Sequence, residues 1–289
     1  MVYDTFPFFN ELELLEVRLA ELDPVVDRFV LAEATRTHSN LPKPLHFAEN
    51  RHRYARWLGK ITHVVVDDCP DTSNAWEIEK FQRDAVGRGL GGCRPGDLIL
   101  NSDVDEIPRA TAVRELPSRM PWGAGAGSRS WSWLLRRPWV VRLARNVFKK
   151  HHPRVLVLQH RQYYHFLNCT SRTLPWWDGT RAVFYRDYTR GRELRMWKGR
   201  RVADAGWHFS YMGGAERVRE KLQAFAHQEY NRPEYLDPGT VEAALREGRW
   251  VLGSEHQLEF VAVDDTYPEF VRRNPERFAN WIRKLPPGL

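Results

Sequence analysis

Two aspartates separated by one residue are the feature of this sequence that most clearly points to chemistry. Asp103 and Asp105 directly follow the apolar segment 97–101. If the chain turns at this point, the two carboxylates converge on one divalent cation. Carboxylate oxygens suit Mg²⁺ or Mn²⁺, particularly where the phosphates of a substrate complete the coordination. A solvated turn gives the same pattern, but the apolar segment in front of the pair favours a metal site.

The elements that position this pair are predicted to be alternating strands and helices. The apolar periodicity predicts an amphipathic helix over 10–22, begun by Asn10, and a second helix over about 75–90, begun by Asn74. Apolar runs predict strands over 25–33, 61–66 and 97–101. Such alternation is typical of a parallel α/β sheet, in which ligands bind at the carboxyl ends of the strands. The two aspartates lie at one of these ends.

The second part of the chain is predicted from weaker patterns. Residues 123–127 indicate a flexible joint, and residues 131–150 a basic, Trp-rich helix interrupted by Pro138. Residues rich in Val, Tyr and Phe predict strands over 154–168 and 181–186. Further helices are predicted over 214–230, 238–247 and 267–284, the last with a break at Pro275.

Composition restricts the class of protein. Of the 289 residues, 42% are hydrophobic and 28% charged, as in ordinary globular proteins. We find no apolar run long enough to span a membrane and no signal-peptide pattern at the first residues. The three cysteines, Cys69, Cys93 and Cys169, are far apart and predict neither a zinc site nor a disulfide framework. We therefore expect a cytoplasmic protein.

A basic stretch, residues 116–177, contains no carboxylate and eleven Lys or Arg residues within a chain of net charge +7. Its basic and aromatic side chains suit an anionic partner such as a phosphate, an anionic membrane surface or a nucleic acid. One possible function is therefore a single-stranded nucleic-acid-binding protein that stacks bases on the aromatic residues. Another is a metal-dependent hydrolase that uses the two aspartates. An ordinary subdomain with an Arg-rich surface would show the same composition.

Several strings of residues resemble family 17 glycosyltransferases. They are segments 4–12, 21–27, 43–45 and 81–83, the string Ser-Asp-Val-Asp-Glu-Ile-Pro at 102–108, and Ala-Gly-Trp-His-Phe-Ser-Tyr at 205–211. The resemblance runs in order from residue 3 to about residue 284. It implies an α/β fold of the GT-A type, which binds a nucleotide-sugar with a mostly parallel central sheet and helices on both faces. It also implies a transfer to a hydroxyl group with inversion.

The resemblance implies a metal-binding role for the aspartate pair. Asp103 and Asp105 match the acidic motif that holds a divalent cation, Mn²⁺ or Mg²⁺, against the diphosphate of the donor. A cation at this place neutralises the charge that develops on the leaving diphosphate. His208 is the candidate for a third protein ligand, although a structural histidine is the alternative.

Further residues are implied to contact the donor. Glu33 and Thr35 end a predicted strand, at a position that faces the base and ribose in a GT-A fold. Gln82 and Arg83 lie on the helix before the acidic motif, and Arg83 is placed to contact the diphosphate or to pair with an aspartate. A polar loop before His208 is expected to close over the diphosphate; it contains Lys198, Arg200 and Arg201. Solvated surface positions are the alternative for all of these residues.

An inverting transfer needs one general base that takes the proton of the acceptor hydroxyl. We rank Asp178 first, because Trp176 and Trp177 beside it suit stacking on a sugar face. Asp204 is ranked second, and Glu106, which follows the metal motif, is ranked third.

These inferences predict one glycosyltransferase domain over 1–289. Residues of about 1–115 bind the nucleotide-sugar and the metal, and about 116–289 form an acceptor half with a basic, Trp-rich insertion at 119–160. By resemblance, the donor is UDP-N-acetylglucosamine, and the acceptor is a glycan, a lipid-linked sugar or a small molecule. We expect a bacterial, cytoplasmic enzyme that contacts the inner face of an anionic membrane through the basic stretch, and we expect no nucleic-acid partner.

Overall fold

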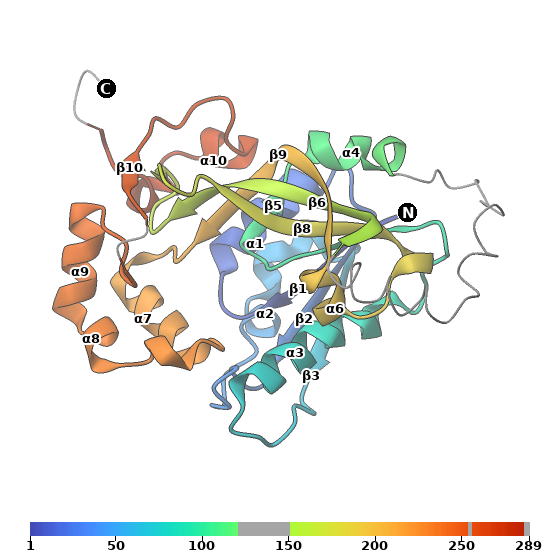
Figure 1. Cartoon of the computed structure of the whole chain (residues 1–289), viewed down its shortest axis with the longest axis horizontal. Coiled ribbons are helices and arrows are strands. Elements are labelled where there is room, and N and C mark those ends of the chain that lie inside the picture. The colour runs from blue at the N-terminus through green and yellow to red at the C-terminus, as the bar shows by residue number, and fades with distance from the viewer. Residues whose placement is uncertain (121–150, 254–255, 286–289) are drawn as a thin grey trace.

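The computed structural model describes residues 1–120, 151–253 and 256–285 (Figure 1). The strands are β1 (Val2–Phe8), β2 (Arg28–Ala34), β3 (Ile61–Val66), β4 (Leu98–Asn101), β5 (Glu106–Pro108), β6 (His151–Tyr164), β7 (Cys169–Ser171), β8 (Trp176–Phe184), β9 (Lys198–Ser210) and β10 (Leu258–Phe260). The helices are α1 (Leu12–Leu22), α2 (His46–Glu49), α3 (Ala75–Ala85), α4 (Ala110–Arg119), α6 (Gly191–Met196), α7 (Gly214–Ala224), α8 (Pro233–Leu236), α9 (Pro238–Glu247) and α10 (Glu269–Arg273). The predicted joint at 123–127, the predicted helix over 131–150 and residues 121–150 of the basic stretch lie outside the described residues.

One ten-stranded sheet runs through both parts of the chain, in the order β10-β7-β6-β8-β4-β1-β2-β3, with β9 paired to β6 and β5 paired to β9. The strands β4, β1, β2 and β3 are parallel, whereas β8 joins β4 antiparallel and also pairs antiparallel with β6. The expectation of a mostly parallel sheet is therefore wrong. A short connection links β6 to β7, and a connection of that length joins antiparallel strands, because a parallel pair needs a long crossover. β7 and β8 both run antiparallel to β6.

Strand β1 lies between β2 and β4, and the sequence patterns did not predict it. Its apolar residues are interrupted by Asp4 and Pro7, which are unusual in a central strand. Asp4 is nevertheless fully buried, because Arg18 on α1 pairs with it. A tertiary ion pair thus allows a strand where the local pattern argues against one.

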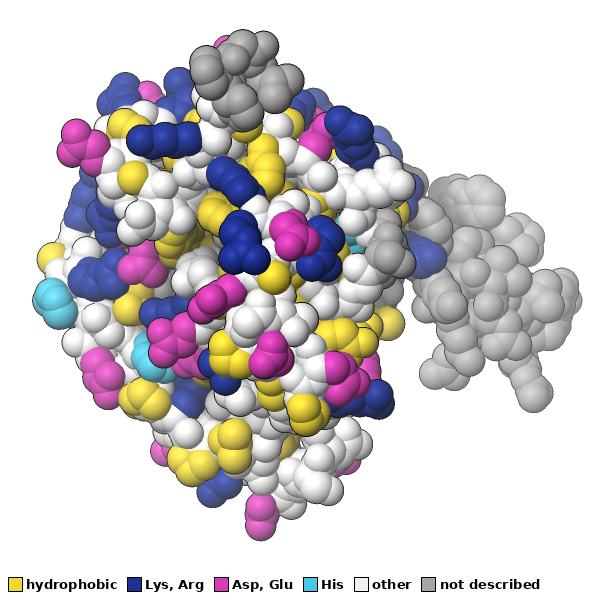
Figure 2. All heavy atoms as spheres, turned by 90° about the vertical axis from the view of Figure 1, so that its left-hand side faces the viewer, with side chains coloured by type: hydrophobic (Ala, Val, Ile, Leu, Met, Phe, Trp, Pro, Cys, Tyr) yellow, Lys and Arg dark blue, Asp and Glu magenta, His cyan; other side chains and the backbone are white. Residues whose placement is uncertain are grey.

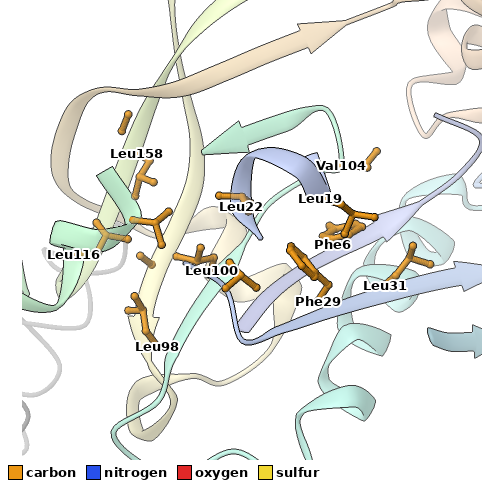
Figure 3. Close-up of a cluster of buried hydrophobic side chains, with 14 of the residues drawn as sticks. Phe6, Leu19, Leu22, Phe29, Leu31, Leu98, Leu100, Val104, Leu116 and Leu158 are labelled. Carbon is orange, nitrogen blue, oxygen red and sulfur yellow. The ribbon is translucent and has the colours of Figure 1, made fainter. Parts of the chain in front are cut away.

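Helices cover both faces of the parallel part of the sheet. On one face, Leu15, Leu19 and Leu22 of α1 pack against Phe6 and Phe29, and Leu116 of α4 joins the same core (Figure 3). On the other face, residues of α3, η2 (Val86–Leu90) and α6 pack against Tyr3 of β1 and against small and β-branched residues of β2, β3 and β4. These two cores fix the end of β4 between α1 and α3.

Most of the predicted elements in the first part of the chain are confirmed, as are α9 and the first half of the helix predicted over 214–230, which is α7. The helix predicted over 10–22 begins at Leu12, and its N-cap residue is Glu11 rather than Asn10. Asn74 caps α3 by accepting the Trp76 N–H at 3.1 Å. The predicted helical tail over 267–284 is wrong: it contains only α10 and a 3₁₀ turn, η6 (Ala279–Trp281).

The described residues also bear on the membrane and nucleic-acid expectations. Within them, no helix combines the length and the apolar character that crossing a bilayer requires. Residues 151–164 of the basic stretch form strand β6, whose residues Val155–Leu158 are buried in the sheet. On the face of the molecule that carries α7–α9, basic and acidic side chains are interspersed (Figure 2).

Candidate active site

The candidate site is built where β4 ends. β4 and β1 are parallel neighbours, and the chain turns over residues 102–106, here called the acidic turn, before it enters β5. The Glu106 N–H donates to the Asp103 carbonyl at 3.0 Å and closes this turn. β5 pairs antiparallel with β9, which places His208 opposite Glu106. Asp103, Asp105, Glu106 and His208 therefore meet at one place.

A buried arginine on α1 holds the acidic turn in shape. Arg18 forms a two-point ion pair with Asp4, at 2.7 and 2.6 Å, and both side chains are fully buried. Its Nη1 donates to the carbonyls of Asp103 and Glu106, at 2.8 and 2.9 Å, and its Nη2 to the Ser102 hydroxyl at 2.6 Å. One guanidinium thus connects β1 to the backbone of the turn that carries the aspartates.

Asp103 is held by two further guanidinium groups. Arg83 on α3 donates to Oδ1 at 2.7 Å, and Nη2 of Arg195 on α6 lies 3.2 Å from Oδ2. Burial alone would raise the pKa of Asp103, but the charges of Arg83 and Arg195 outweigh it and hold the pKa well below its ordinary range. Asp103 is therefore ionised, and its side chain is 30% exposed.

Glu106 is buried and fully engaged. It accepts from Arg195 at 2.7 Å, from the Trp177 indole N–H at 2.5 Å and from the Asp103 N–H at 3.1 Å. Burial alone would raise the pKa of Glu106, but Arg195 outweighs it and lowers the pKa. The carboxylate of Glu106 therefore positions Arg195 and Trp177. The Trp177 ring stacks on His208, with 5.1 Å between the ring centroids.

Asp105 points to the other side of the site. Lys221 on α7 donates to its Oδ2 at 2.9 Å, and His208 Nε2 lies 3.7 Å from its Oδ1. Burial lowers the pKa of His208 against the opposing charges of Asp105 and Glu106, so the imidazole is neutral at pH 7. Among the described residues, the Nδ1 atom of His208 has no hydrogen-bond partner.

The donor atoms at this place fit a divalent cation in kind. They comprise the buried carboxylate of Asp105, the neutral imidazole of His208, whose Nε2 lies 3.7 Å from Asp105, and the partly exposed carboxylate of Asp103, two residues before Asp105. In the described part of the chain, however, no three His, Cys, Asp or Glu side chains are already grouped as a cation site. Asp103 faces Arg83 and Arg195, so its carboxylate must turn from these partners to join Asp105 and His208.

Of the other predicted donor contacts, Glu33, Thr35 and Gln82 make internal contacts. Glu33 is fully buried, where it accepts the Phe47 N–H at 2.8 Å and lies 3.0 Å from His63 Nε2. Thr35 is half-buried beside β3, with its backbone N–H bonded to the Val66 carbonyl at 3.0 Å. Gln82 donates to the Arg36 carbonyl at 2.9 Å. The structure brings only Arg83 of this group to the acidic turn.

The predicted polar loop that contains Lys198, Arg200 and Arg201 is wrong, because these residues begin strand β9. β9 pairs with β6 along its length, so the segment is fixed by the backbone hydrogen bonds of the sheet. All three side chains are exposed, and Arg201 pairs with Asp178 at 2.8 Å. Arg195 on α6, a few residues earlier, is the basic residue of this region that reaches the acidic turn.

The two highest-ranked bases lie on the opposite face of the sheet from the acidic turn. Successive residues of a strand point to opposite faces, and Trp177 of β8 faces Glu106 and His208. Its neighbour Asp178 faces Gln159 and Arg201 instead. Asp204 pairs with Arg161, which is the register partner of Trp176 on that same opposite face. The structure does not bring Asp178 or Asp204 to the acidic turn.

Glu11 is a carboxylate of this region that the sequence patterns did not reveal. It lines a small cavity together with Asp105, Tyr211 and Lys221. Its Oε2 accepts the backbone N–H of Asn10 at 3.0 Å. Burial raises the pKa of Glu11 against the opposing charge of Lys221.

Lys221, Arg195 and Arg18 were missed as well, because each reaches the acidic turn from a distant part of the chain. A local signal existed for Arg18, which lies three residues after Leu15 and four before Leu22 on the apolar face of α1.

Comparison with known proteins shows which family this chain resembles. The model of Glycosyltransferase family 17 matches residues 1–119, which include β1 to α4 and the whole acidic turn. Curated relatives are the beta-1,4-mannosyl-glycoprotein 4-beta-N-acetylglucosaminyltransferases of Homo sapiens and Rattus norvegicus, each 26% identical over 300 aligned positions, and of Mus musculus, 25% identical. Each alignment covers 93% of this chain and 52% of the relative, so the chain spans about half the length of these proteins.

The family model covers the part of the chain that builds the acidic turn, and the relatives align with nearly all of the chain. Residues 1–119 therefore resemble glycosyltransferase family 17, and nearly the whole chain is similar to the curated N-acetylglucosaminyltransferases.

Proposed function

We propose that the protein is a metal-dependent, inverting glycosyltransferase that moves N-acetylglucosamine from UDP-N-acetylglucosamine to a hydroxyl group. The acceptor is a glycan, a lipid-linked sugar or a small molecule. The observation that carries the proposal is the acidic turn at the carboxyl end of β4, within the segment that matches the family. Nucleotide ligands bind at such ends in open α/β sheets.

The cationic residues of the site support a diphosphate-binding role. Arg83, Arg195 and Lys221 converge on the acidic turn from three different helices. Guanidinium groups match the oxygens of a phosphate in pairs. In the proposed reaction, Asp103 turns away from Arg83 and Arg195, and the two guanidinium groups then bind the diphosphate of the donor and stabilise the charge that develops there.

A divalent cation fits the remaining donor atoms. Asp105 and His208 would hold it, with Asp103 as the further carboxylate. When bound, such a cation acts as a Lewis acid that neutralises the leaving diphosphate. Because His208 is neutral at pH 7, its Nε2 atom, which faces Asp105, can act as a ligand without loss of a proton from an imidazolium.

Glu11 is the carboxylate that we assign as the general base. It shares a cavity with Asp105 and Lys221, so an acceptor hydroxyl in that cavity would lie beside the donor site. A raised pKa also suits proton abstraction near neutral pH. The single substitution Glu11→Gln keeps the shape and removes the proton acceptor, so kcat should fall while UDP binding persists.

The test is release of UDP from UDP-N-acetylglucosamine in the presence of Mn²⁺, with and without glycan acceptors, alongside UDP-glucose and UDP-galactose as alternative donors. Asp67→Asn is a matched control for variants of the acidic turn, because Asp67 is exposed and directly follows β3 in the same parallel sheet. Hydrolysis of simple phosphoesters without turnover of any UDP-sugar would show a hydrolase instead.

A further inference from the structure

A second cavity lies on the opposite face of the sheet from the acidic turn. It has a volume of about 500 Å³ and is formed by β6, β7, β8, β10 and the segment before α10. Trp176 lines this cavity, whereas the next residue, Trp177, contacts Glu106 in the active site. Because neighbouring strand residues face opposite sides, the sheet itself separates the two sites.

The aromatic groups of the cavity form a floor and a wall. Tyr163 and Tyr267 are almost completely buried, with ring centroids 5.3 Å apart, and form the floor. Trp176 is 43% exposed, which is unusual for so large a ring. The Arg161 guanidinium lies 5.7 Å from the centre of its ring. The indole and the guanidinium thus offer two planar surfaces to a ligand.

Both arginines that line this cavity pair with carboxylates, and Asp264 adds a further carboxylate to the lining. Arg172 pairs with Glu259 at 2.5 Å, and Arg161 pairs with Asp204 at 3.0 Å. A phosphate or another anion would have to compete with a carboxylate for each guanidinium. A purely apolar ligand would remove water from these ion pairs without replacing its hydrogen bonds, which is unfavourable. The cavity therefore suits a neutral ligand that carries many hydroxyl groups.

A saccharide without charged groups is such a ligand, because it is neutral and carries many hydroxyl groups. The C–H face of a pyranose ring packs on an aromatic ring, and its hydroxyl groups donate to carboxylates and accept from guanidinium groups at the same time. A cavity of this volume is within the ordinary range for small-ligand sites, roughly 300 to 1,000 Å³. We propose that this cavity is a binding site for a neutral oligosaccharide, separate from the donor site and independent of catalysis.

The experiment is titration calorimetry of the full chain with mannotriose, N,N′-diacetylchitotriose and maltotriose, without a donor. We expect one of these neutral oligosaccharides to bind, and Trp176→Ala to weaken its binding at least tenfold. The matched control is Trp76→Ala, because Trp76 is 41% exposed on α3 and lies outside the cavity. Glu259→Gln, which removes the partner of Arg172 at the surface, should weaken binding by about threefold or more.

The proposal would be overturned by no binding of any of the three sugars, by equal binding by the Trp176 and Trp76 variants, or by displacement of the bound sugar by UDP. Stronger binding of glucose 1-phosphate than of the neutral sugars would also contradict it. Turnover of UDP-sugars is measured in parallel on the same variants. Retained sugar binding in a protein that turns over no UDP-sugar would refute the proposed transferase and leave this site intact.

Discussion

At the scale of single residues, the candidate site is a set of opposite charges that cancel. Asp103, Asp105 and Glu106 face Arg83, Arg195 and Lys221, and half of these six residues are buried. The removal of one carboxylate therefore leaves a cation without its partner. Variants at this site change stability as well as activity, and the two effects have to be measured separately.

Asp105→Asn should lower kcat a hundredfold or more, about 3 kcal/mol in the barrier, because it removes a proposed cation ligand. Excess EDTA should abolish the activity of the wild-type protein, and Mn²⁺ should restore it. Steady-state assays with a titration of Mn²⁺ measure both effects. Full activity in EDTA would contradict the proposed metal.

The control for folding is a double variant. Asp105→Asn alone leaves Lys221 unpaired, whereas Asp105→Asn with Lys221→Met removes both charges. We expect the double variant to unfold at a higher denaturant concentration than the single one and still to lack activity.

The sequence revealed the residues whose chemistry is local and missed those that act from a distance. Asp103 and Asp105 stand out because both carboxylates lie within four residues after an apolar run. Lys221 reaches the same place from α7. Asp178 seemed suitable because of its two tryptophan neighbours, but the alternation of β8 turns it to the other face. The sequence cannot show which face of a strand meets the site until the register with its neighbours is known.

At the scale of elements, the site depends on how α1 is docked on β1 and the acidic turn. Arg18 of α1 joins these three segments, because its guanidinium donates both to the Asp4 carboxylate of β1 and to backbone carbonyls of the acidic turn. No shorter or unbranched side chain can replace this set of five donors.

Arg18→Met should lower the free energy of unfolding by about 3 to 5 kcal/mol, because it leaves Asp4 as an unpaired buried charge. Chemical denaturation measures the loss. Arg28→Met is the control, since Arg28 on β2 is exposed and donates only to the Gly59 carbonyl; we expect a change within about 0.5 kcal/mol. Equal effects of both substitutions would show that the buried pair is not important for stability.

A glycine on β9 allows the contact with β5 that places His208. A Cβ atom at Gly206 would lie 2.3 Å from the Ile107 carbonyl oxygen and 2.8 Å from the His160 ring. Gly206→Ala should therefore move β9 away from β5 and cost about 1 to 3 kcal/mol of stability, with a loss of activity through His208. Denaturation and UDP-release assays measure the two effects. Gly59→Ala is the control, because a Cβ atom there meets nothing within 4 Å.

The elements that the sequence predicted well are those whose burial follows from their own periodicity. α1, α3 and the strands β2, β3 and β4 have regular apolar patterns, and all are present. β1 was missed because its buried Asp4 depends on a partner in another element. β9 was missed because its first half is polar and exposed, so only the pairing with β6 shows that it is a strand.

At the scale of the whole molecule, the two parts of the chain share one sheet. β4 of the first part pairs with β8 of the second, and β5 pairs with β9. The active site and the cavity around Trp176 lie on opposite faces of the strands that the second part contributes. A substitution in one site therefore changes no side chain that contacts the other site, so the two sites can be tested separately.

Buried histidines make the folded molecule sensitive to acid. Burial lowers the pKa of His38 to about 4, of His160 to about 3 and of His165 to about 4, from an ordinary value of 6.5. As the pH falls below 6.5, the unfolded chain binds protons that the folded protein does not, so the free energy of unfolding decreases. Arg195 lowers the pKa of Glu106 against the effect of burial, so Glu106 also decreases the free energy of unfolding as the pH falls, but only below about pH 4.5. Glu11 and Glu21, whose pKa values burial raises, act in the opposite direction above that pH.

His165→Asn separates one histidine from these overlapping effects. His165 has a φ of 64°, a conformation that asparagine adopts more readily than most residues, so the variant should fold. We expect the decrease in unfolding free energy between pH 6.5 and pH 4 to be smaller than in the wild type by roughly 3 kcal/mol, because a shift of one pKa unit corresponds to about 1.4 kcal/mol. Urea denaturation at closely spaced pH values measures this difference. An identical slope for the wild type and His165→Asn would show that His165 ionises as freely in the folded protein as in the unfolded chain.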